Sequence, residues 1–167
     1  MPRSAVLAFG RLTALVMLLA AFALLPLTAG AAENPKVKES MQTLKALTAE
    51  LGKPKLDGEN LFFGAAKVNG DFTVVDAVKA KHGGTATLFA KKGDGYVRVS
   101  TNVMRDDKRA IGSPLDASGP AYAAIKQGNS FYGMVDILGK IYDTGYEPIK
   151  SETGDVIGIY YVGYPME

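Results

Sequence analysis

The sequence predicts an α+β fold with a central antiparallel sheet of about five to six strands, flanked by helices. Three features of the chain lead to this prediction. An amphipathic helix pattern occupies residues 34–51, where apolar side chains recur at steps of three and four. Segments rich in strand-forming residues then follow one another, separated by turns such as Gly93-Asp94-Gly95. Strands joined by tight turns pair antiparallel, so the helices are expected on one side of the sheet.

Each expected element has its own signals. For the first helix, Asn34 is suited to the capping position and Pro35 to the first turn, while Gly52 ends the pattern. Two further helices are expected over residues 72–81 and 121–127. The expected strands cover residues 61–68, 85–90, 96–101, 130–138, 140–149 and 156–163, and a long polar, basic connection covers 102–114.

The beginning of the chain has the pattern of a targeting segment. Arg3 and Arg11 make a short basic region, residues 12–25 are apolar and uncharged, and residues 29–32 are small. This order of basic, apolar and small residues is typical of a secretory signal peptide. The alternative is an uncleaved membrane anchor, because the apolar stretch approaches the roughly 20 residues that a bilayer span needs.

The predicted organisation follows from this leader. We expect a signal peptide over residues 1–32, an N-terminal helix and linker over 33–60, and a single domain over 61–167. With either fate of the leader, the globular part is expected to be periplasmic or secreted.

Charge and composition exclude several classes of function. Lys and Arg number 19 and Asp and Glu number 17; the difference equals the two arginines of the leader, so the rest of the chain carries no net charge. Domains that bind nucleic acid usually carry an excess of positive charge, and no nucleic-acid partner is expected. The chain holds no cysteine, which excludes disulfides and cysteine-ligated metals.

Signals for catalysis are sparse. The one histidine, His82, stands at the end of a predicted helix beside Gly83 and Gly84. Neither a nucleophile–base arrangement nor a metal-binding motif can be built from it. The pair Asp106-Asp107 lacks the spacing of a calcium loop and is expected to form a solvated turn. We therefore expect a protein that is not an enzyme and that uses no cofactor and no metal.

Alternation along the strands predicts which side chains share a face. The expected sets are Tyr96, Arg98 and Ser100 opposite Val97, Val99 and Thr101; then Tyr132, Met134 and Asp136; and finally Tyr142, Thr144 and Tyr146.

An arginine, several tyrosines, hydroxyls and one aspartate can thus converge on a single concave face. Arginine binds a carboxylate through two parallel hydrogen bonds, and tyrosine contributes an apolar wall with a polar tip. This is the usual make-up of a small-molecule site. The alternative is that the face is only the solvated side of the sheet, with Asp136 pairing with a nearby basic residue.

Several short runs of the chain match a known family. They are VNGDF at 68–72, GGTATLF at 83–89, YVRVSTNV at 96–103, RAIG at 109–112 and YGMVDILGK at 132–140. Through these runs, the chain from Leu61 onward resembles the single Cache domain described as a Cache 3/Cache 2 fusion. Such domains occur in the extracytoplasmic sensor regions of bacterial chemoreceptors and sensor kinases.

The resemblance implies a Cache (PAS-like) fold that senses a small extracellular molecule, often an organic acid, on one face of the sheet. Carried over position by position, it implies the ligand-binding residues Arg98, Ser100, Arg109, Tyr132, Asp136, Tyr142 and Tyr146. Among these, Arg98 and Arg109 are the implied carboxylate clamps.

Two hypotheses of different classes follow. In the first, the protein is an exported stand-alone sensory domain without an output domain of its own. Its partners would be a small molecule, with a carboxylate favoured, and a membrane-bound signalling protein. In the second, it is a structural or protein-interaction module. The apolar stripe of helix 34–51 would then bind another protein or a second copy in a homodimer; its residues are Val37, Met41, Leu44 and Leu47.

Overall fold

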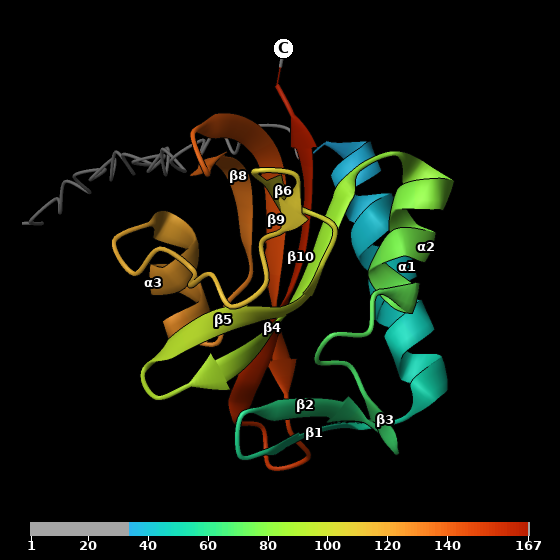
Figure 1. Cartoon of the computed structure of the whole chain (residues 1–167). Coiled ribbons are helices and arrows are strands. Elements are labelled where there is room, and N and C mark those ends of the chain that lie inside the picture. Colours follow the sequence, from blue (N-terminus) through green and yellow to red (C-terminus); the bar gives the residue numbers. More distant parts are fainter. Residues whose placement is uncertain (1–33, 167) are drawn as a thin grey trace, which may run out of the picture.

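A five-stranded antiparallel sheet forms the centre of the computed structural model, which describes residues 34–166 (Figure 1). The strands are β4 (Thr85–Lys92), β5 (Gly95–Thr101), β8 (Phe131–Ile137), β9 (Lys140–Lys150) and β10 (Val156–Pro165). Their order is β5-β4-β10-β9-β8, so the last strand of the chain lies at the centre. The predicted α+β class and antiparallel sheet are confirmed. The predicted leader lies outside the described residues.

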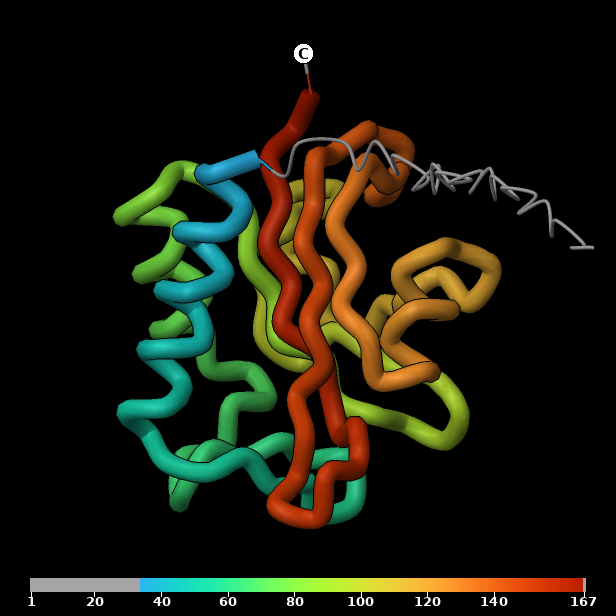
Figure 2. Tube along the Cα trace, turned by 180° about the vertical axis from the view of Figure 1, so that it is seen from behind, coloured from blue at the N-terminus to red at the C-terminus, as the bar shows by residue number. Residues whose placement is uncertain are grey.

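The helices divide between the two faces of the sheet. Helices α1 (Pro35–Leu51) and α2 (Thr73–His82) lie side by side on one face, and α3 (Pro120–Lys126) lies on the other (Figures 1 and 2). The expectation that all helices share one side is therefore wrong. The chain leaves the sheet at one edge, β5, and re-enters at the other edge, β8, so the segment that carries α3 crosses the opposite face. None of the described helices is long and apolar enough to cross a membrane.

Helix α1 begins and packs as its sequence indicates. The Asn34 side chain accepts a hydrogen bond from the Lys36 backbone N–H at 3.0 Å, which caps the helix before Pro35. In the apolar stripe, Val37, Met41 and Leu44 are no more than 1% exposed, and Leu47 is partly buried against the same core. In this structure the stripe is core, so it is not free to serve as the partner surface of the second hypothesis.

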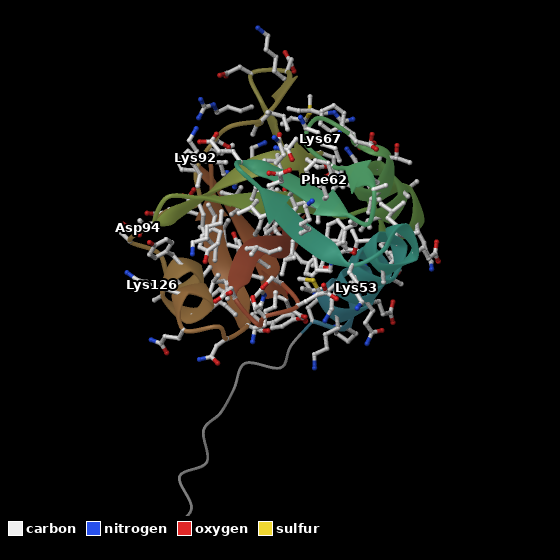
Figure 3. All side chains as sticks on the ribbon, turned by 90° about the horizontal axis from the view of Figure 1, so that it is seen from below. Lys53, Phe62, Lys67, Lys92, Asp94 and Lys126 are labelled. Atoms are coloured by element: carbon white, nitrogen blue, oxygen red, sulfur yellow. The ribbon has the colours of Figure 1, made fainter. Side chains whose placement is uncertain are left out.

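A small second sheet closes one end of the molecule. Its strands are β1 (Pro54–Asp57), β2 (Asn60–Phe63) and β3 (Ala66–Lys67), seen at the bottom of Figure 1 and from below in Figure 3. The single strand expected over residues 61–68 is thus broken, because Gly64 takes a left-handed conformation (φ +58°) and turns the chain. Part of the expected linker is strand β1, which pairs antiparallel with β2.

The long connection expected over residues 102–114 contains a two-stranded hairpin. Strands β6 (Met104–Arg105) and β7 (Lys108–Arg109) are joined by Asp106 and Asp107, whose φ values of 50° and 58° form the turn. The chain then runs along the edge of β5, where the Arg98 N–H donates to the Ser113 carbonyl at 3.0 Å and the Leu115 N–H to the Tyr96 carbonyl at 2.9 Å. In this way residues 102–130 cover the sheet face that α1 and α2 leave free. We call this face the covered face and residues 102–130 the cover.

Gly64 offers a test of this packing, with Gly58 as its matched control. Both glycines have φ near +58°, but a Cβ at Gly64 would collide with the Leu51 carbonyl oxygen, whereas a Cβ at Gly58 would meet nothing within 4 Å. We expect Gly58→Ala to lower the free energy of unfolding by about 1 kcal/mol, the usual cost of a left-handed alanine. Gly64→Ala should cost about 3 kcal/mol or more, because the end of α1 must also move. Urea unfolding followed by circular dichroism measures both; equal losses would contradict the close approach of α1 to β2.

Candidate functional site

A β-bulge in β5 decides which side chains reach the covered face. In the pairing with β4, Phe89 stands opposite Arg98, but the adjacent Leu88 stands opposite Ser100, so Val99 is the extra residue. The bulge shifts the alternation by one residue. Arg98 and Thr101 therefore point to the covered face, whereas Ser100 points toward α2. The predicted set of Tyr96, Arg98 and Ser100 on one face is correct for the first two residues and wrong for Ser100.

Arg98 is a buried cation on the covered face. The residue is 4% exposed, and its guanidinium carbon lies 4.9 Å from the centre of the Phe89 ring. One terminal nitrogen, Nη1, donates to the Ser113 hydroxyl at 2.8 Å and to the Pro114 carbonyl at 3.4 Å, while Nε has no partner. Among the described residues no carboxylate pairs with Arg98. Desolvation accordingly lowers the pKa of its guanidinium.

Two tyrosines in contact, with their rings tilted by 53°, stand close to this arginine. Tyr146 of β9 and Tyr161 of β10 are both fully buried, and their ring centres are 5.0 Å apart. The Tyr146 hydroxyl has no hydrogen-bond partner within the part of the chain that the structure describes. Burial raises the pKa of both phenols well above 10, against the lowering effect of the positive charge of Arg98. Both hydroxyls therefore remain protonated at neutral pH and can donate hydrogen bonds.

Threonine hydroxyls line the same face. Thr87 and Thr101 face each other across β4 and β5 with their hydroxyl oxygens 2.6 Å apart. Thr85 approaches the Tyr161 hydroxyl at 3.2 Å, and Thr144 donates to the Gly133 carbonyl at 2.6 Å. The result is a face with one cation and several hydroxyl groups, closed from outside by apolar side chains of the cover: Val103, Ala110, Leu115, Ala121 and Ile125.

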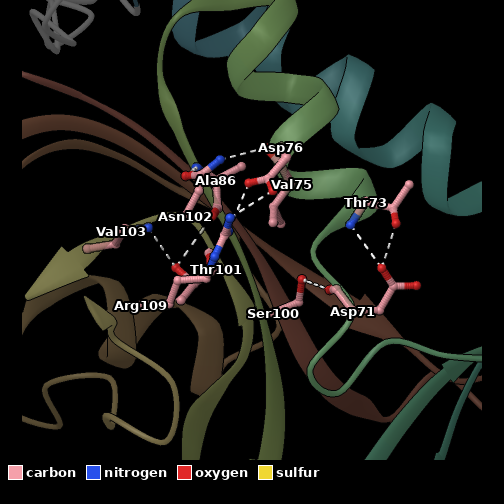
Figure 4. Close-up of polar contacts among 10 residues, drawn as sticks. All are labelled: Asp71, Thr73, Val75, Asp76, Ala86, Ser100, Thr101, Asn102, Val103 and Arg109. Atoms are coloured by element: carbon pink, nitrogen blue, oxygen red, sulfur yellow. Dashed lines mark hydrogen bonds and ion pairs between the residues drawn. The ribbon is translucent and has the colours of Figure 1, made fainter. Parts of the chain in front are cut away.

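Arg109 has a different role from Arg98 in this structure. Its two terminal nitrogens donate to the two carboxylate oxygens of Asp76, each at 2.8 Å, and one also donates to the Thr101 carbonyl at 2.8 Å (Figure 4). The guanidinium lies 4.2 Å from the centre of the Phe72 ring. Arg109 thus connects the cover to α2, and its two-pronged contact is already made with a side chain of the protein.

Three other predicted site residues lie away from the covered face. Ser100 donates to the Asp71 carbonyl on the α2 side, as Figure 4 shows. Tyr132 donates to Glu147 at 2.6 Å beside α1, and Asp136 accepts from the Gly139 N–H at 2.7 Å in the β8–β9 turn. The register explains the last two: Phe131 of β8 pairs with Tyr146 of β9, so Tyr132 and Asp136 point to the other face.

The structure therefore brings together Arg98, Tyr146 and the half-buried Tyr142 from the predicted set. Sequence reasoning missed Thr87, Thr101 and Tyr161. Thr85, Thr87 and Phe89 alternate with Ala86 and Leu88 along β4, and this pattern could have indicated a polar inner face. Tyr161 carried no comparable signal, because it follows another tyrosine, and only the pairing of β10 decides which of the two faces the cover. In the described part of the chain no cluster of three or more His, Cys, Asp or Glu side chains could hold a metal.

Comparison with known proteins gives a family match and several structural neighbours. The model of the Cache 3/Cache 2 fusion domain matches residues 28–167. No curated protein matches the chain in sequence.

The solved structures similar to this one are distant in sequence. The E. coli DcuS sensor domain is 15% identical with a TM-score of 0.44, over 79% of this chain and 77% of that chain. The ligand-binding domain of the Campylobacter jejuni chemoreceptor Tlp3, solved in complex with L-valine, is 12% identical with a TM-score of 0.45, over 78% and 57%. A structure named methyl-accepting chemotaxis protein X is 16% identical with a TM-score of 0.40, over 77% and 58%. This chain thus spans less than two thirds of the last two.

The buried phenols make the stability of the fold sensitive to alkaline pH. Because the pKa values of Tyr146 and Tyr161 are raised on folding, the folded state holds protons that the unfolded state releases above about pH 10. The free energy of unfolding should be unaffected below that pH and should then fall by about 1.4 kcal/mol per pH unit for each tyrosine. Urea unfolding at pH 9 to 11.5 measures the slope of the unfolding free energy against pH. Tyr146→Phe should make this slope shallower by the contribution of one tyrosine, about 1.4 kcal/mol per pH unit. An unchanged slope in this variant would contradict the burial of that hydroxyl.

Proposed function

The chain belongs to the Cache 3/Cache 2 fusion domain family, and on this premise we propose that it binds a small extracellular organic acid on the covered face. Membership confirms the resemblance seen in the sequence. The proposed setting is the periplasm or the exterior of the cell, where the domain would act as an exported sensory module and pass its state to a membrane-bound signalling partner.

The observation that carries the proposal is the buried, unpaired charge of Arg98. A cation removed from water is costly unless an anion or several hydrogen bonds compensate it. Here the compensation consists of one hydroxyl, one long contact to a carbonyl and the face of the Phe89 ring, and Nε is left without a partner. A carboxylate placed against the guanidinium would supply the missing charge and accept the unused hydrogen bond.

The hydroxyl of Tyr146 adds a second point of attachment. It is buried and without a partner, and its raised pKa keeps the proton on the oxygen. An O–H group donating to a carboxylate makes a short, charge-assisted hydrogen bond. Arg98 and Tyr146 together therefore fit an anionic head group with two acceptor oxygens.

The same face favours an organic acid over an amino acid. An amino acid carries an ammonium group, which needs a carboxylate or several acceptors once it leaves water. Of the acidic residues nearby in sequence, Asp136 is held in the β8–β9 turn, and Glu147 faces α1, where it pairs with Lys45 at 2.6 Å. Neither points to the covered face, which offers hydroxyl groups instead.

Matched pairs of ligands test this assignment. We expect glycolate, L-lactate or L-malate to raise the melting temperature of the purified protein, and glycine, L-alanine and L-aspartate to bind at least about tenfold more weakly, because each replaces a hydroxyl by an ammonium group. Thermal shift followed by isothermal titration measures the difference. If the amino acids bind as well as the hydroxy acids, the proposed ligand class is wrong; if no acid binds, the proposed site is wrong.

Variants of the arginines locate the site. Arg98→Gln should lower the affinity for the acid about tenfold or more, since a hydrogen bond to a charged group contributes about 1.5–3 kcal/mol. Ser100→Ala is the control, because that hydroxyl faces Asp71 on the other side of the sheet. Equal affinities for wild type and Arg98→Gln, or an equal loss in Ser100→Ala, would place the ligand elsewhere.

The unpaired charge also has a consequence for the ligand-free protein. Arg98→Met replaces a buried cation by an apolar side chain of similar length, so we expect the free energy of unfolding without ligand to rise by about 1 kcal/mol or more. Arg109→Met is the matched control. It breaks the half-exposed ion pair with Asp76 and should lower stability by about 1 kcal/mol. A loss of stability in Arg98→Met as large as that in the control would show that Arg98 supports the fold rather than a ligand.

A further inference from the structure

A basic hollow lies in the cover, next to the residues that contact Arg98. It has a volume of about 510 Å³ and is lined by residues 105, 106 and 108–114, under the β6–β7 hairpin. Two of its lining residues, Ser113 and Pro114, also accept the hydrogen bonds of the Arg98 guanidinium. A single layer of the cover therefore separates the hollow from the buried cation.

Two cations without an ion-pair partner among the described residues stand at this hollow. Arg105 and Lys108 are directly opposite each other in the register of β6 and β7, an arrangement that like charges disfavour. Among the described residues neither forms an ion pair. Asp106 also lines the hollow and offsets part of this charge, while Arg109 is already paired with Asp76. The positive charge of Arg105 also acts on the buried guanidinium. Desolvation is the main cause of the lowered pKa of Arg98, and the charge of Arg105 lowers that pKa further.

The site behind the cover is closed in this structure. Arg98 Nε and Tyr146 Oη are both inaccessible to solvent, so a ligand reaches them only when part of the cover moves. The layer between hollow and site is attached to the edge of β5 by hydrogen bonds: the Gly112 N–H donates to the Arg98 carbonyl at 2.8 Å, the Arg98 N–H donates to the Ser113 carbonyl at 3.0 Å, and the Arg98 guanidinium holds Ser113 and Pro114 from inside. Gly112 itself has φ +74°, a conformation that glycine adopts without strain.

We propose that Arg105 and Lys108 form an outer anion site, where the incoming carboxylate docks before residues 112–114 open and admit it to Arg98. This inference rests on the proposed function, because it assumes an anionic ligand at Arg98. Charges that act only on the approaching ligand accelerate association in a salt-dependent way and leave dissociation nearly unchanged. The outer site therefore sets the rate of binding, whereas Arg98 and Tyr146 set its strength.

Stopped-flow kinetics with L-lactate separates these roles. The chain has eight tyrosines and no tryptophan, so tyrosine fluorescence reports on the site that contains Tyr146. We expect the double variant R105Q/K108Q to associate about threefold or more slowly than wild type at low salt, with a dissociation rate within about twofold of wild type. At about 0.5 M salt, where screening is strong, the difference should disappear. The control K91Q/K140Q removes the same net charge at two exposed lysines outside the hollow and should associate as wild type does.

Each remaining outcome counts against a defined part of the proposal. A normal association rate in R105Q/K108Q, or an equal slowing in K91Q/K140Q, overturns the outer site. The outer site is also overturned if R105Q/K108Q binds more weakly only because it dissociates faster. That result would mean that Arg105 and Lys108 contact the bound ligand. If wild type binds lactate and R105Q/K108Q associates with it as fast as wild type does, the proposed function stands and the outer site fails. If wild type binds none of the hydroxy acids, the proposed function fails and the outer site fails with it.

Discussion

The arrangement of the covered face depends on one buried cation, the guanidinium of Arg98, which has no carboxylate beside it among the described residues. Arg98 is held by the Ser113 hydroxyl, the Pro114 carbonyl and the ring of Phe89, which are neutral groups. Such groups reduce the cost of burying a charge but do not cancel it. The fold can keep Arg98 in this position because the opposite face of the sheet supplies an apolar core of its own. Under the proposed function, this cost is the free energy that an anionic ligand would recover.

The two faces of the sheet consequently have different chemistry. The face under α1 and α2 is packed with aliphatic and aromatic side chains, and its few buried polar groups are satisfied: Ser40 contacts the Tyr164 hydroxyl at 2.7 Å, and Thr48 donates to the Leu44 carbonyl at 3.1 Å. The covered face holds both of the buried polar atoms that lack a partner in the described structure, Arg98 Nε and Tyr146 Oη. Buried polar atoms in proteins nearly always have partners, and exceptions are informative about function. Both exceptions in this domain lie in one place.

The cover and the helices are connected through the end of β5. The Thr101 hydroxyl faces Thr87 on the covered face, while its carbonyl accepts from Arg109, which in turn holds Asp76 of α2. Next to it, the Asn102 side chain donates to the Val75 carbonyl of α2 at 2.6 Å and accepts from the Ala86 N–H at 2.7 Å. Figure 4 shows the contacts of Arg109, Val75 and Ala86 converging on the consecutive residues Thr101 and Asn102. The cover is therefore attached to the same α2 helix that packs against α1, which gives the two faces a direct mechanical link.

The sequence by itself determined the helices and the main strands, whereas the pairing of strands decided which side chains meet on the covered face. Helix α1, with its Asn34 cap and its buried stripe, follows from local signals, as do the β4–β5, β8–β9 and β9–β10 hairpins and the alternation that groups Tyr142 with Tyr146. Local signals repeat along one strand and carry no information about its neighbour. The bulge at Val99, which exchanges Ser100 for Thr101 on the covered face, arises from the fit between β4 and β5. The register of β8 on β9 sends Tyr132 and Asp136 to the helix side. Arg109 meets Asp76 across 33 residues of chain. These three outcomes depend on contacts between segments distant in the sequence, and therefore only the tertiary structure decides them.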